Sequence, residues 1–242
     1  MQQRRYLIVN ADDFGLSPNI NRGIIHAHEH GIVTSASFMV RWPAAVEAAA
    51  YGRSHPSLGL GLHVDLGEWT CRGGEWVQVY KVVATNDADA VSSEIYRQLD
   101  LFRTLLRSEP THLDSHQHVH RAGPVLTVMR ELAQSLGIPL REFTPSIRYC
   151  GDFYGQLAEG KACHELLTPG ALINVLGNLK PGVTELACHP GLEVKIDSMY
   201  RIEREIELKT LCDPAVRAFL DSRGILLRSF ASLEKTAETT LV

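Results

Sequence analysis

Two adjacent carboxylates and a row of histidines are the residues of this 242-residue chain whose types and spacing could do chemistry. Asp12 and Asp13 follow a short apolar run, and two carboxylates in one site repel each other unless a cation keeps both ionised. In residues 111–120, every even-numbered residue is aspartate or histidine. These residues are His112, Asp114, His116, His118 and His120. On an extended backbone they point to one face, and imidazole with carboxylate is a typical ligand set for divalent metals.

Further histidines fall at the ends of predicted strands. His63 and Asp65 end the apolar run 58–66, and His189 ends the run 184–189. Plainer readings exist for each group. Asp12 and Asp13 could form a helix-capping turn, the 111–120 segment a solvated edge strand, and His63 a hydrogen-bonded core residue. The metal site is the interpretation that accounts for four separate strand ends carrying aspartate or histidine.

The elements that must position these residues alternate between strand and helix patterns. Strands are predicted at 6–10, 33–40, 58–66, 111–120, 184–189 and 225–230. Helices are predicted at 17–31, 43–51, 87–107, 124–136 and 199–222, the last with a break near Pro214. This alternation predicts an α/β fold of parallel units, a distorted or incomplete β/α barrel in one domain over residues 1–242. In such folds the chemistry lies at the carboxyl ends of the strands.

Composition excludes several other classes of function. The net charge of −4 with mixed signs gives no basic surface for nucleic acid or anionic membrane. No apolar run approaches the ~20 residues of a membrane span, and residues 6–10 are too short for a signal-peptide core. Five cysteines without a Cys-x-x-Cys pair predict neither disulfides nor a thiolate zinc site. We therefore expect a cytoplasmic protein.

Aromatic residues gather in segments predicted to be loops at the same mouth of the barrel. They are Trp69, Trp76, Tyr80, Tyr149, Phe153 and Tyr154. Sugar faces stack on such rings, although several of these residues could equally serve the core. Trp69 and Tyr149 are the candidates for substrate binding.

Five motifs occur in an order that matches a known family. They are Asn10-Ala11-Asp12-Asp13-Phe14-Gly15, Gly31-Ile32-Val33-Thr34-Ser35, Gly61-Leu62-His63, the whole of 111–120, and His189-Pro190-Gly191. Over nearly its whole length the chain resembles the YdjC-like carbohydrate deacetylases, which include chitooligosaccharide deacetylases and the deacetylase of hopanoid biosynthesis. Residues 69–89 and 146–167 diverge from that pattern and would shape the substrate pocket.

The resemblance implies a distorted β/α barrel related to polysaccharide deacetylases, with one divalent metal ion, Mg²⁺ or Zn²⁺. Carried over by motif, Asp13, His63 and His116 would be the metal ligands, and Asp12 would be the general base. The implied substrate is a small N-acetylated carbohydrate, with no nucleic-acid partner, and a homodimer is the candidate assembly.

Hydrolysis of an N-acetyl amide needs an activated water, a stabilised oxyanion and a proton for the departing amine. His189 is the candidate general acid, with His118 or His120 in reserve. Asp114, His118 and His120 are candidates for substrate binding or for orienting the ligands. Two alternatives stay open: another metallohydrolase of the amidohydrolase or phosphoesterase type, and a catalytically silent sugar-binding module.

Overall fold

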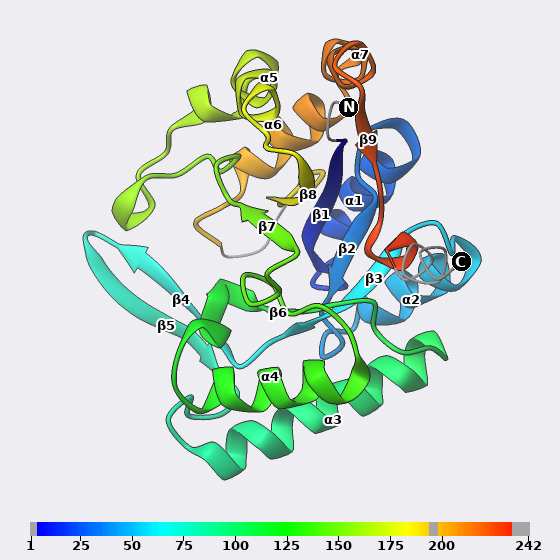
Figure 1. Cartoon of the computed structure of the whole chain (residues 1–242). Coiled ribbons are helices and arrows are strands. Elements are labelled where there is room, and N and C mark those ends of the chain that lie inside the picture. The colour runs from blue at the N-terminus through cyan, green and yellow to red at the C-terminus, as the bar shows by residue number, and fades with distance from the viewer. Residues whose placement is uncertain (1–3, 194–197, 234–242) are drawn as a thin grey trace, which may run out of the picture.

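The computed structural model describes residues 4–193 and 198–233, and its centre is a curved sheet of parallel strands (Figure 1). In spatial order the sheet runs β6-β3-β2-β1-β8-β7, and β9 pairs with the start of β1. The strands of this sheet are β1 (Arg5–Phe14), β2 (Ser35–Phe38), β3 (Gly59–Val64), β6 (Leu113–Ser115), β7 (Ile147–Cys150), β8 (Gly182–Cys188) and β9 (Ile225–Leu227). Every pairing in it is parallel, so the prediction of an incomplete β/α barrel is confirmed.

Helices surround this sheet, with α3 and α4 below it and α5, α6 and α7 above it in Figure 1. The helices are α1 (Pro18–His30), α2 (Ala45–Ser54), α3 (Ala88–Leu106), α4 (Gly123–Leu136), α5 (Pro169–Gly177), α6 (Ile202–Leu211) and α7 (Pro214–Ser222). Short 3₁₀ segments are η1 (His116–Arg121), η2 (Ala158–Gly160), η3 (His164–Leu167) and η4 (Phe230–Ser232). Within residues 4–193 and 198–233, no helix has both the length and the apolar character that crossing a membrane requires.

Local chemistry explains where the helices begin. The side chain of Ser17 accepts a hydrogen bond from the backbone N–H of Ile20, and Pro18 starts α1, as the sequence predicts. Asp87 caps α3 in the same way, through the N–H of Ala90. The break predicted near Pro214 separates α6 from α7, because proline cannot donate the backbone hydrogen bond of a helix interior.

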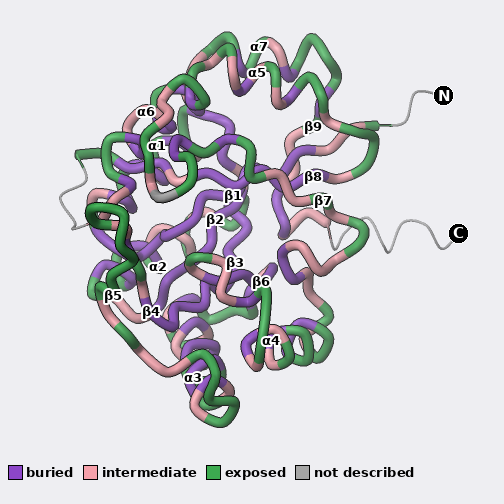
Figure 2. The backbone as a smooth tube through the Cα atoms, turned by 90° about the vertical axis from the view of Figure 1, so that its left-hand side faces the viewer, coloured by how far each residue is buried: buried purple, intermediate pink, exposed green. Residues whose placement is uncertain are grey.

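The core lies between the sheet and its helices. Figure 2 shows the central strands as almost continuously buried backbone, with exposed residues on the outer helices and turns. Residues 7–14 of β1 are all buried, which is typical of a strand covered on both faces. One face of α3, which includes Val91, Ile95 and Phe102, packs into the same core.

Two sequence-based predictions are wrong. Residues 111–120 are not one extended segment, because the strand ends at Ser115 and η1 follows, with left-handed backbone at Gln117 and His118 (φ 51° and 53°). Trp69, Trp76 and Tyr80 do not lie in loops. They lie on the antiparallel hairpin of β4 (Gly67–Arg72) and β5 (Glu75–Lys81), which projects from the barrel in Figure 1. Tyr149 does not lie in a loop either, because it lies on β7. β7 and α5 are further elements that the sequence patterns did not reveal.

Candidate metal centre and active site

A bulge at the end of β1 places both aspartates of the first motif in one cavity. Successive side chains on a strand normally point to opposite faces. Here the register against β2 shifts between Ala11 and Phe14, and Asp13 adopts a left-handed backbone with φ 70°. A bulge of this kind re-aims the side chains next to it. Asp12 and Asp13 therefore both line the cavity and are almost fully buried.

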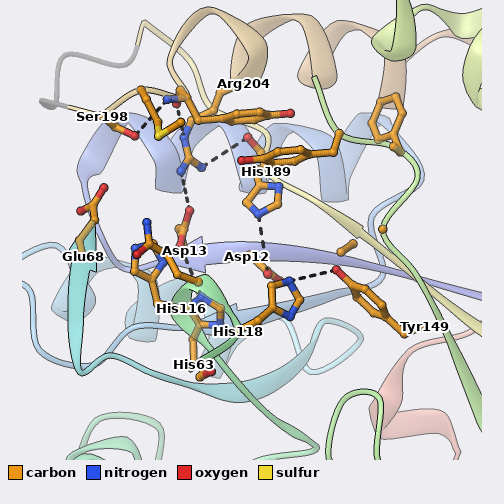
Figure 3. A pocket seen from close by; sticks show the side chains of 18 of the residues that line it. Asp12, Asp13, His63, Glu68, His116, His118, Tyr149, His189, Ser198 and Arg204 are labelled. Atoms are coloured by element: carbon orange, nitrogen blue, oxygen red, sulfur yellow. Dashed lines mark hydrogen bonds and ion pairs between the residues drawn. The ribbon is translucent and has the colours of Figure 1, made fainter. Parts of the chain in front are cut away.

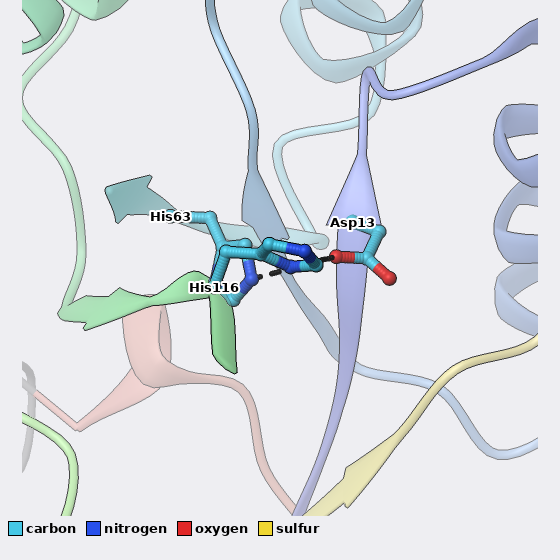
Figure 4. Close-up of side chains that lie close together, drawn as sticks. All are labelled: Asp13, His63 and His116. Carbon is cyan, nitrogen blue, oxygen red and sulfur yellow. Dashed lines mark hydrogen bonds and ion pairs between the residues drawn. The ribbon is translucent and has the colours of Figure 1, made fainter. Parts of the chain in front are cut away.

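Asp13, His63 and His116 come together from the ends of β1, β3 and β6, as Figure 4 shows. Asp13 Oδ1 lies 3.5 Å from His63 Nε2 and 3.1 Å from His116 Nδ1. One ligand atom from each residue lies within 4.8 Å of the other two. Ligands about 2.1 Å from a tetrahedral zinc ion are about 3.4 Å apart, so this spacing fits a divalent cation. The donor set, two imidazoles and a carboxylate, fits it as well.

The other ring nitrogen of His63, Nδ1, is held by a carboxylate. His63 Nδ1 lies 2.7 Å from Asp114 Oδ1, and Ser37 Oγ donates to Asp114 Oδ2 at 2.5 Å. Burial lowers the pKa of His63, but Asp114 and Asp13 outweigh it and raise that pKa to about 10. The surroundings therefore favour positive charge at this point. A carboxylate behind a ligand histidine also fixes its ring orientation and tautomer.

Asp12 is held in a buried ion pair. Arg141 donates from Nη1 to Asp12 Oδ2 and from Nη2 to Asp12 Oδ1, both at 2.7 Å. Burial raises the pKa of Asp12, but the Arg141 guanidinium outweighs burial and keeps that pKa below its usual range. Asp12 is consequently an ionised acceptor at neutral pH. Arg141 also pairs with Asp114 at 2.8 Å, so the space between these two carboxylates is already filled by its positive charge.

His189 follows β8 and lies across the cavity from the cluster of Asp13, His63 and His116. Its Nε2 is 3.8 Å from Asp12 Oδ2, and its backbone N–H donates to Glu207 of α6. The rings of Tyr154 and Tyr200 pack edge-on against the imidazole. Burial is the main cause that lowers the pKa of His189 to about 4, so the ring is neutral at neutral pH.

Two buried arginines complete the site, and sequence reasoning missed both. Arg204 of α6 donates from Nη2 to Asp13 Oδ2 at 2.5 Å, which leaves Oδ1 facing the histidines. Burial raises the pKa of Asp13, but Arg204 and the histidines lower it well below its usual range. Arg141 follows Leu140, which forms an isolated parallel bridge with Leu113 of β6. That added strand-like step carries Arg141 to the mouth of the barrel, and no motif in the sequence marks it.

Asp12, Asp13, His63, His116, His189 and Arg204 line one cavity of about 370 Å³ (Figure 3). This volume lies in the range of small-molecule sites. Its walls include His118 and Tyr149, whose ring nitrogen Nε2 and hydroxyl oxygen are 3.2 Å apart. The strand-end residues Asp12, Asp13, His63, His116 and His189 therefore meet at one mouth.

The remaining candidate residues lie behind the cavity, in the core or on the hairpin. His120 is fully buried behind it, and His112 stacks on Phe230 in the core. Trp69 is 45% exposed on the hairpin and lies outside the residues described as lining the cavity. Its backbone exchanges hydrogen bonds with the side chain of Gln117. Asp65 turns away to Arg41. Residues 111–120 thus divide between the core, the candidate metal-ligand cluster of Asp13, His63 and His116, and the cavity wall.

The model of the YdjC-like protein family matches residues 6–222. The chain belongs to the YdjC-like family. Two relatives of this YdjC-like protein are a carbohydrate deacetylase of Geobacillus stearothermophilus and a chitooligosaccharide deacetylase of Serratia marcescens. Each is 32% identical to it; the alignments cover 96% and 95% of this chain, respectively, and 99% of each relative.

Solved structures extend the comparison. A protein of Enterococcus faecalis, provisionally assigned to cellobiose-phosphate cleavage, superposes with a TM-score of 0.73 at 25% identity, covering 95% of this chain and 99% of its own. A family 4 carbohydrate esterase of Streptomyces lividans, solved with acetate, gives a TM-score of 0.57 at 11% identity, covering 94% and 92%. The second likeness shows that the YdjC-like chain shares the fold of that esterase.

Proposed function

We propose that this protein removes N-acetyl groups from an N-acetylated sugar or short oligosaccharide in a metal-dependent hydrolysis that releases acetate. The observation that carries the proposal is one cavity that joins a metal-type ligand group to an ionised carboxylate and a half-buried imidazole. The names of the 32%-identical relatives support the substrate class. We also propose a cytoplasmic location and a homodimer, neither of which the chemistry requires.

In the proposed reaction, Asp13, His63 and His116 hold the divalent metal. A metal bound there, Mg²⁺ or Zn²⁺, supplies Lewis-acid chemistry for activating water and polarising the acetyl carbonyl. Asp12 takes the proton of the attacking water as general base. Its ion pair with Arg141 keeps it ionised and fixes the direction of its oxygens, at the cost of some basicity.

The amine can leave only after its nitrogen is protonated, and His189 is the proposed donor. His189 is neutral at the start, because burial lowers its pKa to about 4. Its Nε2 lies 3.8 Å from Asp12 Oδ2, so the proton that Asp12 takes from water has a short path to this ring. His189 then passes that proton to the amine, and the proton count closes: amide and water give acetic acid and amine, which are acetate and ammonium at neutral pH.

Two other functions compete with this proposal: a different metallohydrolase and a silent sugar-binding module. The test is acetate and amine release from a panel of N-acetylated mono- and oligosaccharides, with phosphoesters in parallel, by protein loaded with Zn²⁺, Mg²⁺, Mn²⁺ or Co²⁺. We expect equal amounts of acetate and free amine from at least one sugar. Phosphoester cleavage without acetate release would favour the metallohydrolase, and sugar binding without turnover would favour the module.

A further inference from the structure

We propose that His118, His120 and Glu142 form a second divalent-metal site, of the zinc type, at the wall of the cavity. One ligand atom from each of the three residues lies within 4.8 Å of the other two. The site is separate from the Asp13 group, and nothing in the proposed deacetylation requires it. Its failure would therefore leave the proposed function standing.

Two buried ring nitrogens without a hydrogen bond point to a ligand. His118 Nδ1 and His120 Nε2 are buried and have no hydrogen-bond partner, and the His120 side chain is fully inaccessible to solvent. Buried polar atoms are nearly always paired, so two such atoms in one cluster need an explanation. A metal ion takes the lone pair that a neutral imidazole presents at this position.

The opposite ring nitrogen of each histidine is held by a side-chain hydroxyl group. His118 Nε2 lies 3.2 Å from the Tyr149 hydroxyl, and His120 Nδ1 lies 2.6 Å from Ser115 Oγ. Histidine ligands almost always bond through their second nitrogen in this way, which fixes the tautomer and the ring orientation. Both rings are thus oriented with the free nitrogen available.

The carboxylate completes the set at a suitable spacing. His118 Nδ1 and Glu142 Oε1 are 3.4 Å apart, which is about the edge of a zinc tetrahedron. His118 and Glu142 both hold left-handed backbone, with φ 53° and 66°. Two imidazoles and one carboxylate select Zn²⁺ or a similar borderline cation over Mg²⁺ or Ca²⁺. A metal here would tie η1 to the segment that precedes β7.

Arg121 competes for this carboxylate. Its Nε donates to Glu142 Oε2 at 2.8 Å and its Nη2 donates to Oε1 at 2.5 Å. The guanidinium neutralises Glu142 and repels a cation nearby. The proposal therefore makes an unusual prediction: replacing Arg121 by glutamine should tighten zinc binding at this site, by about tenfold.

The experiment is a zinc titration of metal-free protein followed by calorimetry, with bound zinc counted per chain. All variants carry His30→Gln, because the exposed rings of His26 and His30 lie 4.7 Å apart and could bind zinc on the surface. We expect two zinc ions in this background and one after His63→Ala. Glu142→Gln should lose the second ion, or weaken it at least tenfold. The matched control is Glu109→Gln, because Glu109 pairs with Arg103 on the surface as Glu142 pairs with Arg121, and it should keep both ions.

Three results would overturn the proposal. They are a single zinc ion in the His30→Gln background, a second ion of unchanged affinity in Glu142→Gln, and no tightening in Arg121→Gln. His120→Gln adds a fourth test, and far-UV circular dichroism checks its fold because His120 is buried. If that variant does not fold, the Glu142 and Arg121 variants decide the question.

Discussion

Replacing Asp114 by asparagine should weaken metal binding without removing any of the three proposed ligands. Asp114 is fully buried, accepts from Ser37 at 2.5 Å, and faces His63 Nδ1 at 2.7 Å. Asparagine keeps the shape and one acceptor oxygen, but it loses the charge that strengthens the bond to His63. Arg141 keeps Asp12 and Glu185 as partners, so the fold should survive.

The expected size of the effect follows from the role of Asp114 behind His63. Partners of ligand histidines typically contribute 10–100-fold in metal affinity. In free energy this is about 1.4–2.8 kcal/mol of weaker binding. Loss of Asp13 or His116 should cost more than this, because those variants remove a ligand atom itself.

The assay is competition between metal-free protein and a chelator of known affinity. Asp65→Asn is the matched control, because Asp65 is also fully buried and paired with an arginine, Arg41 at 2.8 Å, but turns away from the cavity. The metal affinity of Asp65→Asn should stay within about twofold of that of wild type, because a substitution that shares no partner with the metal ligands acts independently of them. The reasoning is refuted if Asp114→Asn binds metal as tightly as wild type, or if Asp65→Asn weakens it equally.

Three further predictions test the roles of single residues. Asp12→Asn should keep its metal and lose about 10²–10⁴-fold in turnover. Asp13→Asn should instead lose metal and regain part of its activity when metal is added. The opposite pattern in metal content and rates would reverse the two assignments. His189→Gln should slow amide hydrolysis by about 10²–10⁴-fold but slow an aryl acetate far less, because a phenolate leaves without a proton; equal losses would remove His189 as the acid. Burial lowers the pKa of His112 to about 4, below its unfolded value of 6.5, so stability should fall as pH drops from about 6.5 towards 4. In urea unfolding, His112→Gln should lose about 2 kcal/mol less than wild type between pH 7 and pH 5, and an equal loss would contradict this cause.

The sequence carried the β/α alternation and the strand ends, because both depend on local patterns. Apolar runs of five to nine residues, capped helices and proline breaks are set by near neighbours in the chain. The rule that chemistry lies at the carboxyl ends of parallel strands then brought Asp12, Asp13, His63, His116 and His189 to one mouth. The cavity lining agrees with that expectation.

Residues whose position depends on distant packing could not be predicted in the same way. Arg141 and Arg204 stand 129 and 191 residues after the aspartates that they neutralise, and neither belongs to a recognisable motif. The alternation of residues 111–120 suggested one extended face, but a left-handed turn at Gln117 and His118 redirects the second half of the row. Ser115 helps to hold this turn, since its Oγ accepts the backbone N–H of His120 at 3.0 Å.

The hairpin escaped prediction for a related reason. Most of β5 is exposed, so it lacks the alternation of buried and exposed residues that marks a strand on a core. The available signal in the sequence was the pair Gly73-Gly74, because Gly-Gly is typical of tight hairpin turns that need positive φ. Both glycines do have positive φ in the structure.

The most direct test of the central claim is acetate release from an N-acetylglucosamine disaccharide by protein stripped of metal, before and after a divalent metal is added back. The same measurement on His116→Ala serves as the paired arm, with metal content determined for every sample. The account predicts no release from stripped wild type, recovery when metal is restored, and no recovery in His116→Ala at matched metal concentration. Full release from the stripped protein, or recovery in His116→Ala equal to that of wild type, would contradict a metal held by Asp13, His63 and His116.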